Sequence, residues 1–169
     1  MRVREKAHTR EGDAIAAARR RLPMVEVDGA TPLIGERGAV TLLDAFEGRR
    51  MLMAYYFMWH TGSPAPEQCE GCTWVTSQVR ELSYIHSRDV TYATFCQGPY
   101  EESARYRDFM GWEMLWYSAQ ARSTASWLDA GWAGCTSFAT CAKDPRSSRL
   151  TGRQVAASRR WITATGCST

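Results

Sequence analysis

The sequence predicts an α/β domain in which parallel strands alternate with helices, and two observations carry this prediction. First, Met51–Trp59 is continuously apolar and aromatic, which is typical of a strand buried on both faces. Second, another buried-strand segment, Asp89–Cys96, follows a stretch in which Val75, Val79 and Leu82 repeat at helical spacing. Strand, helix and strand in this order form a βαβ unit with a right-handed crossover, so we expect a sheet covered by helices on both faces.

Length and composition are those of one globular domain. The chain has 169 residues, 44% of them apolar and 23% charged, which excludes a disordered or fibrous protein. No apolar run reaches the roughly 18 residues of a membrane helix, and the charged N-terminal residues precede no apolar segment. The net charge of +3 is too weak to indicate nucleic-acid binding. We therefore predict a cytoplasmic protein with no membrane or nucleic-acid partner, and its oligomeric state stays open.

Ahead of the βαβ unit, the sequence predicts a helical arm followed by a hairpin. Asp13–Arg21 is rich in alanine, and its last arginines favour the negative end of a helix dipole, so residues 1–22 are expected to be a helical extension. Met24–Val27 alternates apolar and polar residues, and the Asp-Gly pair after it is a turn signal. Thr31–Ile34 is therefore the expected returning strand.

The remaining elements complete a domain expected to span residues 23–118. The helix that begins near Cys72 is expected to run to about His86. A further helix, with two glutamates in its first turn, is expected to end near Gly111. Met114–Tyr117 is a short apolar run that we expect to be a third strand.

The sharpest chemical feature is the CxxC motif formed by Cys69 and Cys72. It lies directly after a buried strand and a proline-containing loop, at the predicted start of a helix. Unpaired backbone N–H groups and the helix dipole stabilise a thiolate there, and such cysteines have pKa values of roughly 3.5 to 7.5 rather than about 8.5. We therefore predict Cys69 as the nucleophile and Cys72 as the resolving thiol, with Glu70 opposing a very low pKa.

Two other uses of the thiol pair stay open on the residues alone. A zinc site needs four ligands, which would require His60, His86 and Cys96 to converge on the pair. A thiol pair that is merely packed is the other alternative. Taken separately, Cys96 is most simply a small core residue, and His86 a group at the C-terminus of a helix. No metal and no cofactor is predicted.

Three other side chains flank the motif in sequence. His60 follows the first buried strand and is predicted to assist deprotonation of Cys69, with a loop histidine hydrogen-bonded to the backbone as the equal alternative. Trp59 and Trp74 are expected to pack in the core, and the alternative is an apolar wall for a partner.

Four separated blocks carry a resemblance to a known family: RRRLPMVEVDGATPLIGERGAVTLLDAFEGRRMLMAYYFMW, CEGCTW, ELSYIHSRDVTYATFCQGPYEESARYRDFMGW and WYS. In this order they resemble the bacterial thioredoxin-like family catalogued as domain of unknown function family 899, over about residues 15–118. The resemblance implies a thioredoxin-like three-layer sandwich related to peroxiredoxins, with a central mixed sheet and helices on both faces. It also implies that the family's cysteine pair falls on Cys69 and Cys72, and it supplies no substrate.

The sequence departs from these relatives at particular positions. Leu115 stands where members of the family usually have proline. Peroxiredoxins carry Pro-x-x-x-Thr/Ser-x-x-Cys around their reactive cysteine, whereas the residues three and seven positions before Cys69 are Pro66 and Gly62. Peroxidase activity is therefore not expected.

The tail, residues 119–169, departs most. It carries seven Lys and Arg against two Asp and Glu, and almost no strand pattern. The family has two further strands and a helix here, so we hypothesise that the tail is read out of frame, which sequencing of the coding DNA around codons 118–122 would test. In that case the sheet lacks its closing hairpin. The cysteines of the tail, to which the resemblance gives no role, are Cys135, Cys141 and Cys167.

These observations lead to two functional hypotheses. The first is a thiol–disulfide oxidoreductase in which Cys69 attacks a protein or small-molecule disulfide and Cys72 resolves the product. The second is a catalytically inactive thioredoxin-fold binding or scaffold protein that uses the CxxC loop as a contact surface.

Overall fold

The computed structural model describes residues 1–21, 25–120, 137–143 and 150–156. Its helices, including the short 3-10 helices η1 and η2, are α1 (Arg2–Arg20), η1 (Asp44–Phe46), η2 (Ala65–Glu67), α2 (Glu70–Ser77), α3 (Ser83–His86) and α4 (Tyr100–Phe109). Its strands are β1 (Val25–Val27), β2 (Pro32–Gly35), β3 (Gly38–Thr41), β4 (Met51–Phe57), β5 (Val90–Cys96), β6 (Leu115–Ser118), β7 (Ser137–Lys143) and β8 (Leu150–Ala156).

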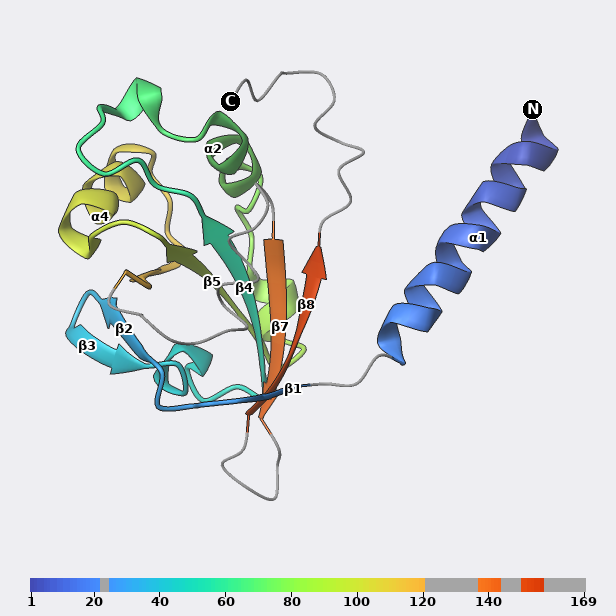
Figure 1. Ribbon diagram of the computed structural model, residues 1–169, viewed down its shortest axis with the longest axis horizontal. Coiled ribbons are helices and arrows are strands. Elements are labelled where there is room, and N and C mark those ends of the chain that lie inside the picture. Colours follow the sequence, from blue (N-terminus) through green and yellow to red (C-terminus); the bar gives the residue numbers. More distant parts are fainter. Residues whose placement is uncertain (22–24, 121–136, 144–149, 157–169) are drawn as a thin grey trace.

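The eight strands form one mixed sheet in the order β1-β8-β7-β4-β5-β6-β2-β3 (Figure 1). Strands β4, β5 and β6 are parallel, with β4 and β5 paired from Met51↔Val90 to Phe57↔Cys96. The predicted βαβ unit is thus confirmed, with α2 and α3 in the crossover between β4 and β5. Because parallel strands end at one edge of the sheet, the segments that follow β4, β5 and β6 meet there.

Strand β4 separates two cores, because its side chains alternate between the faces of the sheet. Tyr55 and Phe57 face the helices, whereas Leu52 and Tyr56 face the β2–β3 hairpin and η1. The buried residues of the helix-face core are Tyr55, Phe57, Trp59, Cys72, Tyr92, Cys96, Trp112, Met114 and Trp116. The buried residues of the hairpin-face core are Val27, Leu33, Leu42, Ala45, Phe46, Leu52, Ala54, Tyr56, Ala93, Phe95, Tyr117 and Ala119.

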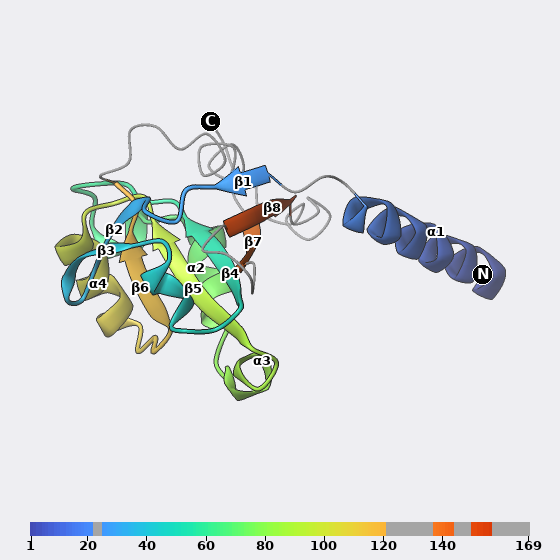
Figure 2. The ribbon, with the colours of Figure 1, turned by 90° about the horizontal axis from the view of Figure 1, so that it is seen from below.

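The helices differ from the predicted ones in their limits. Helix α1 begins at Arg2, well before Asp13, and projects from the rest of the molecule (Figures 1 and 2). The single helix expected to continue to His86 is wrong, because α2 ends at Ser77 and a separate turn, α3, follows. Side chains favour the break: Arg80 Nε donates to the Ser77 carbonyl at 3.2 Å, and Glu81 Oε1 accepts from the Ser83 N–H at 2.7 Å.

One predicted strand pairing is also wrong. Strand β1 does not return on β2 as a hairpin; it pairs antiparallel with β8, and the two lie side by side in Figure 2. Strand β2 pairs with β3 and β6 instead. The expected absence of strands after residue 118 is wrong for β7 and β8, which form an antiparallel pair beside β4. Pairing with the edge of β4 outweighs a weak local pattern. Cys141 is a β7 position, and Cys135 and Cys167 lie outside the described residues.

Candidate functional site

The structure places the CxxC motif at the N-terminus of α2, beyond the carboxyl end of β4 (Figure 1). Cys69 is the N-cap residue and is partly exposed, and its Sγ accepts a hydrogen bond from the Cys72 backbone N–H at 3.4 Å. Cys72, in the first turn, has no exposed surface. Both are free thiols. The N-cap position is held because Cys69 supplies the acceptor that the first turn of a helix needs.

The two thiols have pKa values displaced in opposite directions. A hydrogen bond from the Cys72 side chain is the main cause that lowers the pKa of Cys69 from its ordinary value of 9.0 to about 6. The backbone N–H groups of Cys72 and Gly71 and the charge of His60 act in the same direction, against the effect of burial. The same hydrogen bond, together with burial, raises the pKa of Cys72. At neutral pH the pair is therefore a partly exposed thiolate beside a buried thiol.

Two groups that act on the Cys72 sulfur were not indicated by the sequence. The Met58 backbone N–H donates to the Cys72 Sγ at 3.5 Å. The hydroxyl of Tyr55, a residue of β4 with no exposed surface, also interacts with the Cys72 side chain and acts to lower its pKa. The signal available in the sequence was only that position 55 is a polar aromatic residue within a buried strand. Side chains alternate along a strand, so once one β4 residue was known to face the helices, Tyr55 could have been assigned to the same face.

The loop that carries His60 is fixed by Gln68, the residue before Cys69. Gln68 is buried, its Oε1 accepts from the His60 N–H at 3.0 Å, and its Nε2 donates to the His60 carbonyl at 2.9 Å and the Ser63 carbonyl at 3.0 Å. The backbone of His60 is thus held by the Gln68 side chain, while the His60 side chain is exposed. Gln68 was missed because polar side chains in loops seldom indicate burial.

Hydrogen bonds also join this loop to α4. Trp59 Nε1 donates to Glu102 Oε1 at 3.1 Å, and the Gly62 N–H donates to the same oxygen at 2.9 Å. A Cβ on Gly98 would lie 2.1 Å from the Trp59 ring, so only glycine fits where the chain leaves β5. Thr73 Oγ1 and the Tyr106 hydroxyl, 3.0 Å apart, join α2 to α4. The loop, α2 and α4 therefore form one framework around Cys69.

The other residues singled out in the sequence are scattered. Trp59 is buried as expected, but Trp74 on α2 is 56% exposed, which corrects its assignment to the core. Cys96 is fully buried, and burial raises its pKa to about 12. His86 is the last residue of α3. Within the described ranges, no three His, Cys, Asp or Glu side chains gather as a metal site, so His60, His86 and Cys96 do not converge there.

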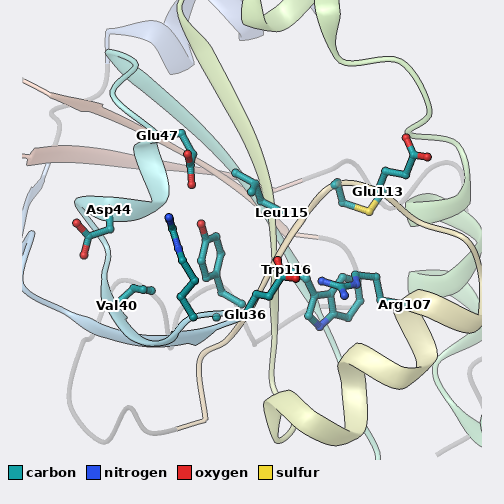
Figure 3. Close-up of a pocket in the computed structure, with 12 residues that line it drawn as sticks. Glu36, Val40, Asp44, Glu47, Arg107, Glu113, Leu115 and Trp116 are labelled. Atoms are coloured by element: carbon teal, nitrogen blue, oxygen red, sulfur yellow. The ribbon is translucent and has the colours of Figure 1, made fainter.

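Two of the cavities on the molecule bear on where a substrate could bind. A cavity of about 330 Å³ lies between η1, the β2–β3 hairpin and β6, and Figure 3 shows charged side chains such as Glu36, Asp44 and Arg107 around it. It contains none of the predicted site residues. A groove of about 280 Å³ lies between α4 and the loop that precedes the CxxC motif, and neither cysteine of the motif lines it. Its lining residues are Trp59, Ser63, Ala65, Glu102, Arg105, Tyr106 and Phe109.

The sheet, the crossover and the position of the helix define a thioredoxin-like α/β protein. The chain belongs to the family described as bacterial protein of unknown function (DUF899), whose family model matches residues 1–147. The resemblance over residues 15–118 is thus confirmed, and the match extends past it at both ends, through β7. No curated protein matches the sequence.

Solved structures with this fold share little sequence with the chain. A Xanthomonas campestris bacterioferritin comigratory protein with alkyl peroxide reduction activity is 13% identical, with a TM-score of 0.52 over 77% of this chain and 85% of that chain. Xanthomonas campestris peroxiredoxin Q is 15% identical, with the same TM-score and coverage. A secreted Mycobacterium tuberculosis disulfide oxidoreductase is 8% identical, with a TM-score of 0.49 over 77% and 85%. The similarity to the two Xanthomonas campestris structures establishes the fold.

Among the described residues, none of the helices has the length and apolar character that crossing a membrane requires.

Proposed function

We propose that the protein is a thiol–disulfide oxidoreductase in which Cys69 is the nucleophile and Cys72 the resolving thiol. The observation that carries this proposal is the asymmetry of the pair: a partly exposed thiol with a pKa of about 6 beside a fully buried one whose pKa is raised. A nucleophile must be a thiolate and reachable, whereas a resolving thiol must be protected from side reactions. The two cysteines of the motif meet these requirements separately.

The reaction needs no group beyond the two thiols and the substrate disulfide. The Cys69 thiolate attacks one sulfur of the disulfide, and the other sulfur leaves as a thiolate that takes up a proton. The Cys72 sulfur, after losing its proton, attacks Cys69 and releases the second substrate thiol. The protein pair is oxidised to a disulfide by two electrons, and the substrate is reduced to two thiols. His60 is proposed to assist through its charge, which favours the Cys69 thiolate.

The partner is proposed to be a protein or small-molecule disulfide that docks beside the loop. The groove between the loop and α4 presents Trp59, Tyr106 and Phe109, and Phe109 is 80% exposed. Apolar aromatic surface of this kind suits contact with an extended peptide or an aromatic disulfide. A peroxide substrate is disfavoured, because Pro66 occupies the position at which peroxiredoxins carry Thr or Ser. A cytoplasmic location stays a prediction.

The direct test is disulfide reduction by the wild-type protein and by Cys69→Ser. With dithiobis(nitrobenzoate) or glutathione disulfide as substrate and dithiothreitol as the final reductant, we expect the variant to lose at least about a hundredfold in rate. Cys96→Ala is the matched control, since Cys96 is a buried thiol in the same core, and its rate should stay within about twofold of wild type. Equal rates for wild type and Cys69→Ser would refute the proposal.

The alternative, a binding protein without turnover, draws on the exposed Trp74 beside the motif. A large exposed aromatic side chain is a common feature of contact surfaces. Thiol titration before and after mild oxidation separates the two functions. Reversible loss of two thiols at Cys69 and Cys72 supports the oxidoreductase, and a pair that never forms a disulfide supports the binding protein.

A further inference from the structure

The resolving step requires a group that stabilises negative charge on the Cys72 sulfur, and the CxxC motif alone does not supply one. In the proposed function, on which this inference rests, Cys72 must become a thiolate before it can attack Cys69. Cys72 has no exposed surface, so bulk water cannot solvate the negative charge that develops on its sulfur. Some fixed donor of hydrogen bonds must take the place of water.

Two groups that can donate a hydrogen bond to a Cys72 thiolate come from one short stretch of chain, residues 55–58. The Met58 N–H, just after β4, donates to the Cys72 Sγ at 3.5 Å. The Tyr55 side chain stands on β4, is fully buried in the same core as Cys72, and lies on the face of the strand that meets the helices. Strand β4 is paired on both sides, with β5 and β7, so these donors are held on a rigid element.

The balance of groups around Cys72 changes during the reaction. In the reduced pair, the hydrogen bond to Cys69 and the charge of Cys69 both keep the proton on Cys72. Once Cys69 is part of a mixed disulfide, it carries no charge and needs no hydrogen bond, so both effects disappear. Burial still disfavours the Cys72 thiolate, and Tyr55 and the Met58 N–H favour it.

We propose that the Tyr55 hydroxyl is the group that, with the Met58 N–H, stabilises the Cys72 thiolate as it attacks the Cys69 sulfur. The new Cys69–Cys72 bond forms while the bond from Cys69 to the substrate sulfur breaks. The substrate leaves as a thiolate with the bonding electron pair, and the proton that Cys72 gave up goes to solvent. Tyr55 keeps its own proton throughout and acts as a hydrogen-bond donor.

Other titratable groups lie near Cys72, but none of them takes the proposed role of the Tyr55 hydroxyl. These are Cys72 on α2, Cys69 at the N-cap of α2, and Tyr92 on β5, whose buried ring lies in the same core. His60 acts on Cys69, from the exposed end of the loop. Burial raises the pKa of Tyr92 to about 12, so at neutral pH it is uncharged and does not titrate in the range where Cys72 must ionise.

The test separates the two steps within one experiment. One molar equivalent of dithiobis(nitrobenzoate) is mixed with the reduced full-length protein, and release of the coloured thiol is followed by stopped flow. The first release reports attack by Cys69, and the second reports attack by Cys72 on the mixed disulfide. Peptide mass mapping of quenched samples identifies the cysteines joined in each phase.

For Tyr55→Phe we expect the second phase to slow by about tenfold or more, with the first phase within about twofold of wild type. The pH midpoint of the second phase should move to higher pH. Tyr56→Phe is the matched control, because it removes a buried hydroxyl from the same strand on the opposite face. Neither phase should change in that variant.

Each outcome has a distinct meaning. An unchanged second phase in Tyr55→Phe overturns the inference, and so does an equal slowing of both phases, which would indicate a general structural role. Misfolding cannot imitate the expected result, because an intact first phase is read from the same molecules. If the wild-type protein shows only the first phase and forms no Cys69–Cys72 disulfide, the proposed function itself fails.

Discussion

The two faces of β4 are equally well buried, yet only one of them carries the candidate chemistry. Leu52 and Tyr56 on the hairpin face and Tyr55 and Phe57 on the helix face are each at most 2% exposed. The helix face lies under α2, whose first turn holds Cys72 in the same buried core as Tyr55. In the described part of the hairpin-face core, the buried side chains contain no thiol. Alternation along one strand thus separates a packing surface from a reactive one.

The difference follows from which elements each face meets. The helix face receives a helix N-terminus, where orphan N–H groups favour negative charge. The hairpin face receives the β2–β3 hairpin and η1, which bury apolar side chains against Ala54 and Phe95. Stability should therefore depend on both faces, and thiol reactivity on the helix face. The following changes test that division, from the largest expected effect to the smallest.

The largest effect is expected from Cys72→Ser. This change keeps the proposed nucleophile but removes the proposed resolving thiol, so turnover should stop with the substrate attached to Cys69. Intact-mass analysis after mixing with dithiobis(nitrobenzoate) should show one bound nitrothiobenzoate per chain, located at Cys69. Turnover at a wild-type rate, or attachment elsewhere, would contradict the division of roles within the pair.

The next largest effects should be on stability, and they should be similar for the two faces. Phe57 contacts the rings of Trp59, Tyr106, Trp112 and Trp116, with centroids between 5.3 and 6.3 Å apart. Phe57→Ala should lower the free energy of unfolding by about 3–5 kcal/mol, and Leu52→Ala on the opposite face by about 2–5 kcal/mol. Urea unfolding followed by fluorescence measures both.

The two variants should differ in their thiol chemistry. Phe57→Ala removes part of the core around Cys72 and should change the rate of the resolving phase, whereas Leu52→Ala should leave it within about twofold. An equal change in both variants would mean that the faces are coupled, and that the separation drawn from the structure is wrong.

The sequence predicts the centre of the fold well, because strands buried on both faces have a continuous apolar pattern that is visible locally. This is why Met51–Trp59 and Asp89–Cys96 indicated β4 and β5, while the helical spacing of Val75, Val79 and Leu82 indicated the helix after the motif. The pairing of β1 with β8 could not be inferred, since it joins segments far apart in the chain and depends on edges rather than local pattern. The strands β7 and β8 were missed for the same reason.

Only the two cysteines of the candidate site could be predicted from the sequence. A CxxC motif after a buried strand specifies Cys69 and Cys72 from spacing and context. The groups that act on them are distant in sequence or inconspicuous: Tyr55 is hidden within an apolar run, and Gln68 is a polar loop residue that proved to be buried. Their roles depend on tertiary contacts, which no local pattern records. His60 stays a prediction, since its side chain is known only to favour the Cys69 thiolate by charge.

The smallest effect concerns the pH dependence of the nucleophile. Since the pKa of Cys69 in the folded protein is about 6, its alkylation by iodoacetamide should be nearly constant above pH 7 and fall about tenfold per pH unit below 6. Cys96 should stay unreactive in the folded protein, because it is fully buried and its pKa is raised to about 12. Because the pKa of Cys69 is lowered by folding, its thiolate stabilises the fold fully above the ordinary value of 9.0, and this contribution is lost as pH falls toward 6. An alkylation midpoint near 9 would show that the N-terminus of α2 and the Cys72 thiol do not activate Cys69, and the reactive face of β4 would then be no more than a second packing surface.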